Sequence, residues 1–219
     1  SYTGAVTLST DVTLTTTSNG NVTFGSTVNS ADATARDLTL SIGTGTARFD
    51  GVVGGNYVLD VIGITGNLDL NAAILKSDSS AGATSLSVSG TSDLGANVKT
   101  TGAQSYTGAV TLSGGDRTLT GSTITTNGAI IGGSNSLSIS GNAVFGNSTD
   151  DTITGVNELS VSGTTTINTN TVTTAGAQAY TGAVTLGADV TLTTTSNNVT
   201  FSSTVNSADA TARDLTLSI

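Results

Sequence analysis

Short runs in which apolar and small polar residues alternate recur along this 219-residue chain. Val6-Thr7-Leu8 and Val12-Thr13-Leu14 are typical, and Leu38–Ile42 extends the same pattern. A period of two with β-branched apolar residues predicts strands that bury one face. Segments rich in Gly and Asn separate the runs, as turns do. No segment longer than a turn has the i, i+3, i+4 spacing of an amphipathic helix, so the pattern predicts an all-β fold.

The first 42 residues occur a second time near the other end of the chain. Ser1–Ile42 returns as Ala179–Ile219 with one gap, at Gly20, and four substitutions. The offset between the copies is 178 residues before the gap and 177 after it. We therefore expect one continuous domain over residues 1–219, made of one tandem period of about 178 residues (1–178) and the start of the next (179–219).

Two shorter motifs recur at variable spacing. YTGAVTL and LS(V/I)SG begin, respectively, at Tyr2, Tyr106 and Tyr180 and at Leu86, Leu137 and Leu159. Repeats that tolerate insertions favour a stack of similar layers whose loops vary in length. We expect the three tyrosines to occupy equivalent positions in these layers, with each ring packed and each hydroxyl reaching water or a turn.

Two all-β architectures fit this pattern: a parallel β-helix and a series of tandem β-sandwich domains. The strands are short and numerous, some motifs recur about 20 residues apart, and outward positions are mostly Thr, Ser and Asn. These features favour the β-helix. Coils of about 20 residues with strands about 4.8 Å apart would give about 11 turns and a rod about 50 Å long.

The alternation also predicts which side chains form the core. In the first copy the inward residues are Val6, Leu8, Val12, Leu14, Val22, Phe24, Val28, Leu38, Leu40 and Ile42. Their counterparts in the second copy are Val184, Leu186, Val190, Leu192, Val199, Phe201, Val205, Leu215, Leu217 and Ile219.

Composition narrows the possible chemistry. The chain has no Cys, His, Met, Trp or Pro. It therefore lacks disulfides, thiolates and the commonest general base and metal ligand. The six basic residues are scattered and the net charge is −9, which argues against a nucleic-acid partner. The most apolar segment, Tyr57–Ile64, is too short to span a bilayer and contains Asp60, so we expect no membrane insertion.

Four groups of polar residues are candidates for a site. Asn147–Thr152 offers oxygen ligands that suit Ca²⁺, although a solvated turn with adjacent Asp residues explains it better. Paired carboxylates act in glycoside hydrolysis, and the candidates are Asp50, Asp60, Asp69 and Asp78. Arg36-Asp37 and Arg213-Asp214 recur before LTLSI and suggest a loop ion pair or a contact between layers. A hydroxyl array for binding ice or glycans would come from Thr15–Thr17, Thr164–Thr166, Thr169 and Thr171.

The repeated phrases also resemble a known family. TTxGAQxYTGAVTLGADVTLTTT, NVTFSSTVN and LSVSG, clearest over Thr100–Leu112 and Thr173–Ile219, are similar to repeat regions of filamentous-haemagglutinin-like adhesins and related β-strand-repeat surface proteins of bacteria. The resemblance implies a right-handed parallel β-helix, export to the cell surface, and a role in attachment, aggregation or biofilm. It carries no catalytic motif onto these residues.

We therefore expect a secreted or cell-surface structural and adhesive shaft that is not an enzyme. We assign no catalytic, cofactor-binding or metal-ligating residue and no cofactor. The expected partners are further copies, end to end or side by side, with surface glycans or neighbouring cells as additional ones. The alternatives are a surface-binding module with an outward Thr/Asn face and, third, a polysaccharide-active enzyme.

Overall fold

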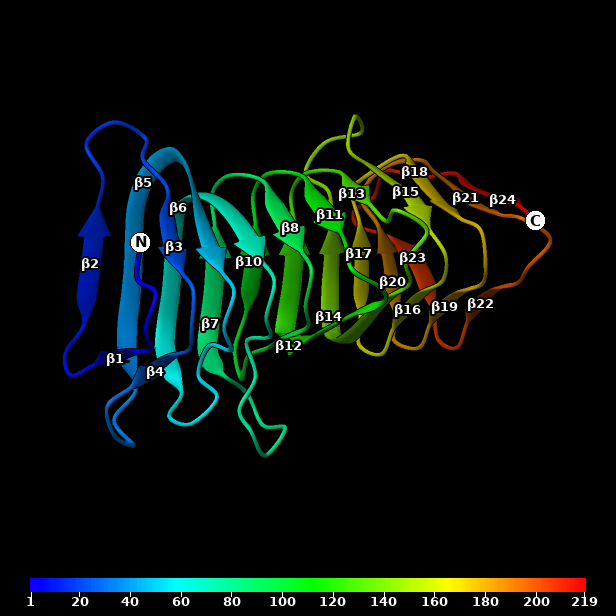
Figure 1. The fold of residues 1–219 in the computed structure, drawn as a ribbon. Coiled ribbons are helices and arrows are strands. Elements are labelled where there is room, and N and C mark those ends of the chain that lie inside the picture. The colour runs from blue at the N-terminus through cyan, green and yellow to red at the C-terminus, as the bar shows by residue number, and fades with distance from the viewer.

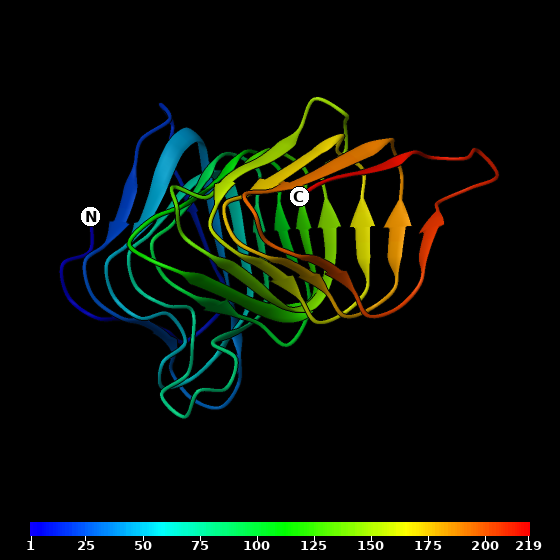
Figure 2. The same cartoon turned by 90° about the vertical axis from the view of Figure 1, so that its right-hand side faces the viewer.

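The computed structural model describes residues 1–219 and contains strands and turns but no helix. The chain winds about 10 turns around one axis, and its strands pair in parallel with strands of the preceding and following turns. Figures 1 and 2 show an elongated body whose N- and C-terminal ends lie far apart along that axis. This arrangement is a parallel β-solenoid, which confirms the predicted fold class.

Three columns of paired strands, here called sheets 1, 2 and 3, run along the solenoid. Sheet 1 contains β3 (Val22–Phe24), the second part of β5 (Arg36–Phe49), the second part of β6 (Leu59–Leu70), β8 (Ser92–Leu94), β11 (Val110–Leu112), β13 (Ile130–Ile131), β15 (Thr152–Val156), β18 (Thr171–Thr174), β21 (Val190–Thr194) and β24 (Leu215–Ser218). Sheet 2 contains β1 (Val6–Leu8), β4 (Val28–Ser30), β9 (Val98–Lys99), the first part of β12 (Arg117–Thr126), the first part of β14 (Leu137–Phe145), β16 (Leu159–Val161), β19 (Gln178–Tyr180) and β22 (Val199–Phe201). Sheet 3 contains β2 (Val12–Thr15), the first parts of β5 and β6, β7 (Ala83–Val88), β10 (Gln104–Tyr106), the second parts of β12 and β14, β17 (Thr165–Ile167), β20 (Val184–Leu186) and β23 (Val205–Ser207).

The length of a turn varies because the loops at the corners vary. Ser87 pairs with Ser105, 18 residues later, whereas Thr13 pairs with Thr39, 26 residues later. The chain accordingly makes about 10 turns, slightly fewer than the 11 expected from 20 residues per turn. Insertions at corners leave the strand-to-strand pairing intact, as a stack of layers permits.

A single axial core fills the space between the three sheets. It contains 42 buried residues, and most of the predicted inward side chains belong to it or pack against it. Leu217 and Ile219, in the last turn, are 43% and 64% exposed, whereas their counterparts Leu40 and Ile42 are fully buried. The alternation is the same in both copies. β5 pairs with β6 of the next turn, whereas β24 pairs only with β21 of the preceding turn, and the difference in exposure follows from this.

The two copies of the repeated segment lie on different sides of the solenoid. Val6–Leu8 belongs to sheet 2, but its counterpart Val184–Leu186 belongs to sheet 3. Likewise β2 is in sheet 3 and the equivalent β21 in sheet 1. Following the strands in order, the chain makes eight turns and one third of a turn between Tyr2 and Tyr180. One period of the sequence is therefore not a whole number of turns.

The three YTGAVTL motifs accordingly do not occupy equivalent positions. Tyr2 pairs with Phe24 in sheet 1, Tyr106 lies in sheet 3 and Tyr180 in sheet 2. That expectation is wrong, because a short strand requires only the correct inward or outward phase and a partner one turn away. Contacts within each copy are nevertheless kept. The Tyr2 and Phe24 rings stack with centroids 5.3 Å apart, and those of Tyr180 and Phe201 with centroids 5.4 Å apart.

Two of the tyrosines belong to buried hydrogen-bond networks that the sequence pattern does not reveal. The Tyr180 hydroxyl donates to Gln178 Oε1 at 3.0 Å, and Gln178 Nε2 donates to the Thr193 carbonyl at 2.9 Å and to Thr174 Oγ1 at 3.3 Å. An equivalent network forms in the preceding TTGAQSY segment, among Thr100, Gln104, Tyr106 and Thr120. The expectation that every tyrosine hydroxyl reaches water or a turn is therefore wrong for Tyr106 and Tyr180. Burial raises the pKa of both phenols well above the usual value.

We predict that Tyr180→Phe lowers the free energy of unfolding by about 1–3 kcal/mol, because it leaves Gln178 Oε1 buried without its donor. Urea unfolding measures this change. The matched control is Tyr2→Phe, since Tyr2 is 42% exposed and its hydroxyl makes no intramolecular hydrogen bond, so no comparable loss is expected. Equal effects of the two substitutions would contradict the network.

We also predict a specific disulfide that reports the rotation between the copies. Ser160 and Ala179 are register partners in sheet 2, so Ser160→Cys with Ala179→Cys should cross-link on mild oxidation in a chain without other cysteines. If the second copy lay on the same side as the first, Thr185 would be the sheet 2 residue instead. The control pair is therefore Ser160→Cys with Thr185→Cys. Cross-linking of the control pair alone, detected by mass spectrometry, would refute the one-third turn.

Candidate functional site

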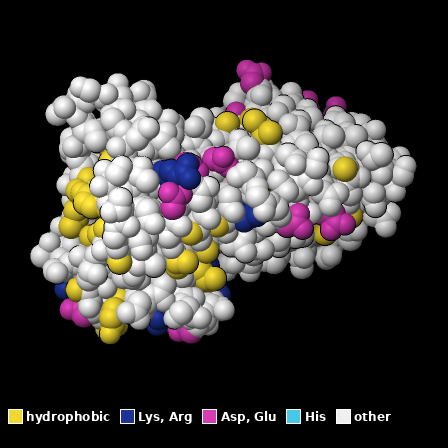
Figure 3. All heavy atoms as spheres, in the orientation of Figure 1, with side chains coloured by type: hydrophobic (Ala, Val, Ile, Leu, Met, Phe, Trp, Pro, Cys, Tyr) yellow, Lys and Arg dark blue, Asp and Glu magenta, His cyan; other side chains and the backbone are white.

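The outer surface of sheet 3 carries an unbroken row of uncharged, mostly small residues. Successive register partners in this row are Thr13, Thr39, Gly63, Ser87, Ser105, Thr125, Val144, Thr166, Thr185 and Asn206. Parallel pairing places equivalent positions of neighbouring strands about 4.8 Å apart. Figure 3 shows the sparse distribution of charge on one face of the molecule.

Sheet 1 carries a more regular threonine array toward the C-terminal end. Thr171, Thr191 and Thr216 form one row, and Thr173, Thr193 and Ser218 form a second row beside it. The residues of the predicted array, Thr15–Thr17, Thr164–Thr166, Thr169 and Thr171, do not form one array, because Thr15 and Thr166 lie in sheet 3 and Thr171 lies in sheet 1. Thr165 and Thr169 are buried, and the Thr169 hydroxyl donates to the Asp151 carbonyl. Along Thr164–Thr166, successive side chains point alternately to the outside and into the core. The number of threonines alone could not show this.

Two of the four candidate carboxylates come together, around an arginine. Arg48 Nε donates to Asp50 at 2.8 Å and Arg48 Nη1 to Asp69 at 3.2 Å. Asp60 lies near the start of β6, and Asp78 lies in the loop between β6 and β7. The structure therefore does not gather the four carboxylates on one face, and the Arg48 cluster is an exposed ion-pair network of small energetic value.

The carboxyls with perturbed pKa values are all shifted toward stronger acidity. Hydrogen bonds from the Ser80 side chain and backbone, aided by Lys76, lower the pKa of Asp78 to about 2. The backbone N–H groups of Thr34 and Thr211 lower the pKa values of Asp32 and Asp209. A glycosidase general acid needs the opposite shift, so these three groups do not meet that requirement.

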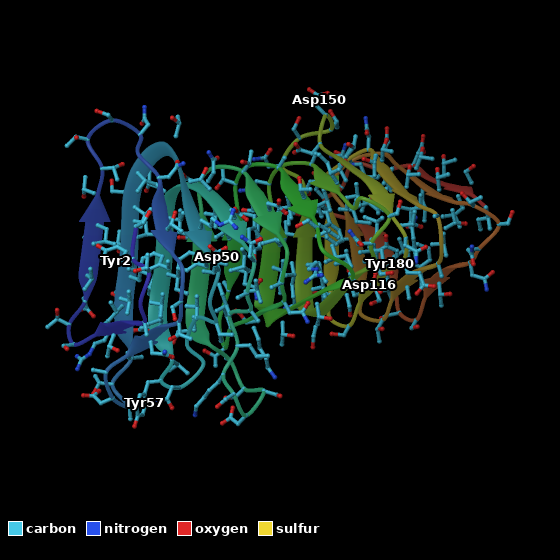
Figure 4. All side chains as sticks on the ribbon, in the orientation of Figure 1. Tyr2, Asp50, Tyr57, Asp116, Asp150 and Tyr180 are labelled. Atoms are coloured by element: carbon cyan, nitrogen blue, oxygen red, sulfur yellow. The ribbon has the colours of Figure 1, made fainter.

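The Asn147–Thr152 segment forms a loop in which the Asp151 carboxylate stabilises the loop backbone. Asp151 Oδ2 accepts hydrogen bonds from the backbone N–H groups of Asn147 and Ser148, each at 3.1 Å. Asp150 lies at the tip of the projecting loop and points away from the body (Figure 4). No group of three or more acidic side chains gathers as it would around a metal ion.

The Arg-Asp pairs contribute to two different contacts. Arg36 forms a loop ion pair with Asp32 at 3.7 Å, and Arg213 does the same with Asp209 at 3.6 Å. Asp37 instead links three successive turns. Its backbone N–H donates to Asp11 Oδ1 and its own Oδ1 accepts from the Val61 N–H, both at 3.0 Å. Both suggested types of contact are therefore present.

The two ends of the solenoid expose strands with a partner on one side only. At one end, Tyr2 is half-exposed, although its counterpart Tyr180 is fully buried. At the other end, β22, β23 and β24 pair only with the preceding turn, through β19, β20 and β21. The unpaired edges offer backbone N–H and C=O groups, and the core side chains beneath them are partly uncovered.

Comparison of the chain with known protein families, curated proteins and solved structures finds no match. The class of the protein thus follows from its fold alone, which is a parallel β-solenoid built from tandem sequence repeats. The structure contains no helix long and apolar enough to cross a membrane.

Proposed function

We propose that this chain is part of the shaft of an exported bacterial surface protein, with a mechanical and adhesive role. The observation that carries the proposal is the continuous stacking of all three sheets around one core from the first turn to the last. Each turn is hydrogen-bonded to the turns on either side, so stiffness comes from the whole stack. Export and adhesion rest on the resemblance of the repeated phrases to bacterial adhesins.

Because one period of the sequence is not a whole number of turns, the proposed shaft has a further property. In a tandem array, each period of about 178 residues adds eight and one third turns, which correspond to a length of about 40 Å. A feature that occurs once per period then appears on the three sides of the rod in succession. It returns to the same side after three periods, or 25 turns, about 120 Å further along the rod. Such a shaft offers the same surface chemistry in three directions.

Strand edges offer a means of assembly wherever an array of such turns ends. The exposed edges of β22, β23 and β24 match, sheet by sheet, the free edges at Tyr2, β1 and β2. End-to-end association would pair sheet 2 with sheet 2 and sheet 3 with sheet 3, and it would cover Leu217 and Ile219. We propose further copies as the main partner, through these edges or side by side.

We predict that chains of one, two and three joined copies of residues 1–178 form rods that lengthen by about 40 Å per copy in negative-stain electron microscopy. Ile131 is 47% exposed and occurs once per period, so Ile131→Cys labelled with gold marks each copy. The labels should lie on the three sides in turn. Beads joined by flexible links, or labels along one side, would contradict the proposed array.

For the cellular role, we expect an antibody against residues 1–42 to label thin rods rooted at the surface of the producing cells. An antibody against an unrelated cytoplasmic protein of the same cells is the control. Label inside the cells, or on compact released particles, would contradict the proposed role as a surface shaft. The predicted rod geometry would still stand, because it is tested separately by the joined copies.

A second candidate function is a surface-binding module, which the threonine array on β18, β21 and β24 favours. Two parallel rows of hydroxyl groups with a constant spacing suit a flat, repetitive ligand such as ice or an ordered glycan. The array ranks second because it covers few turns, and the longer row on sheet 3 also contains Gly63 and Val144.

A further inference from the structure

At two neighbouring places in sheet 2, apolar side chains take outward positions. Val52 precedes the inward Val53, and Ala73 and Leu75 flank the inward Ile74, so apolar side chains take outward positions. Most other strands place Thr, Ser or Asn there. Because Val53 and Ile74 are bridge partners on successive turns, the outward apolar residues of both turns are neighbours.

These side chains form the floor of the largest recess in the molecule, about 590 Å³ in volume, here called the hairpin recess. The recess extends over three successive turns of sheet 2, from Asn29 through Val52 to Ala73 and Leu75. Its size is within the range of small-molecule sites. Figure 3 shows hydrophobic side chains gathered over the N-terminal part of the displayed face.

A projecting hairpin forms one wall of the recess. Leu75 and Ala81 pair antiparallel, and the Ser77 N–H donates to the Gly55 carbonyl at 2.8 Å, which ties the hairpin to the preceding loop. Gly54 has φ +69°, and a Cβ there would overlap the Gly82 carbonyl oxygen, so only glycine permits this approach. The wall is therefore built into the backbone and does not depend on one flexible side chain.

The rim offers uncharged hydrogen-bonding groups that the fold leaves free. Asn29 Oδ1 accepts the Asn56 backbone N–H at 2.9 Å, which leaves the Asn29 amide nitrogen uncommitted. The side chains of Asn56 and Ser77 make no intramolecular hydrogen bond. The cation at the rim, Lys76, is paired with Asp78 at 3.3 Å. Tyr57, 41% exposed, follows Asn56 on the outside of the same loop (Figure 4).

We propose that the hairpin recess binds a neutral carbohydrate chain. A sugar ring combines an apolar C–H face with a periphery of hydroxyl groups, and the recess combines an apolar floor with amide and hydroxyl groups at its edge. The neutralised Lys76 and a net charge of −9 disfavour an anionic polymer. An extent of three turns accommodates more than one sugar ring. This site is separate from the threonine rows and does not depend on the shaft proposal.

The test is binding of four oligosaccharides to the whole 219-residue chain by isothermal titration calorimetry. Cellohexaose, maltohexaose and xylohexaose are neutral, and hexagalacturonate is acidic. We expect at least one neutral hexaose to bind and hexagalacturonate not to bind. Ala73→Arg fills the floor and should weaken that binding at least ten-fold. Asn56→Ala, which removes an exposed amide without intramolecular hydrogen bonds, should weaken it about three-fold or more.

Ile131→Ala, at an outward apolar residue on β13, is the matched control and should bind as the unchanged chain does. Circular dichroism establishes that each variant folds, and Asn56→Ala keeps the test informative if Ala73→Arg does not fold. Binding of hexagalacturonate alone, binding of no oligosaccharide, or binding unaffected by the recess variants would overturn the proposal.

Discussion

Parallel pairing between successive turns is the interaction on which the rest of this structure depends. It places each residue directly over a residue of the previous turn, so one inward column of side chains becomes a continuous core. The same pairing satisfies the backbone N–H and C=O groups of every internal strand. The stack is therefore held together without disulfides or helices. The strands β22, β23 and β24 pair on one side only, and there Leu217 and Ile219 are exposed, whereas Leu40 and Ile42 of the same repeated sequence are buried.

The pairing tolerates variation in everything except the inward and outward phase. Turns differ in length because corners absorb insertions, and a repeated segment can occupy any of the three sheets. The one-third turn between the two copies follows from this tolerance. Each copy keeps its own contact between turns, such as Tyr180 on Phe201, while its position around the axis changes. A repetitive sequence thereby produces a rod whose repeated features point in three directions.

Departures from the simple pattern mark the features that distinguish one part of the rod from another. Gln104 and Gln178 place polar side chains in the core, where each is satisfied by a tyrosine hydroxyl and neighbouring carbonyls. Val52, Ala73 and Leu75 do the reverse and place apolar side chains outside, where a hairpin shelters them. The acidic residues mostly hold local structure: Asp151 binds loop N–H groups, and Asp37 connects turns.

The sequence by itself determined the strand pattern, the absence of helix, the solenoid and most of the core. The reason is that alternation with a period of two residues indicates directly which side chains face inward. The sequence could not determine that Tyr2, Tyr106 and Tyr180 lie in three different sheets, because that position depends on the summed lengths of all the intervening loops. Nor could it show which threonines form rows, since Thr171 and Thr191 are brought together only by register between turns. The recess depends on the close approach of Gly54 to Gly82, two distant glycines in the chain. Tertiary structure decided these features because each arises from contacts between turns, whereas the alternation is a property of each strand alone.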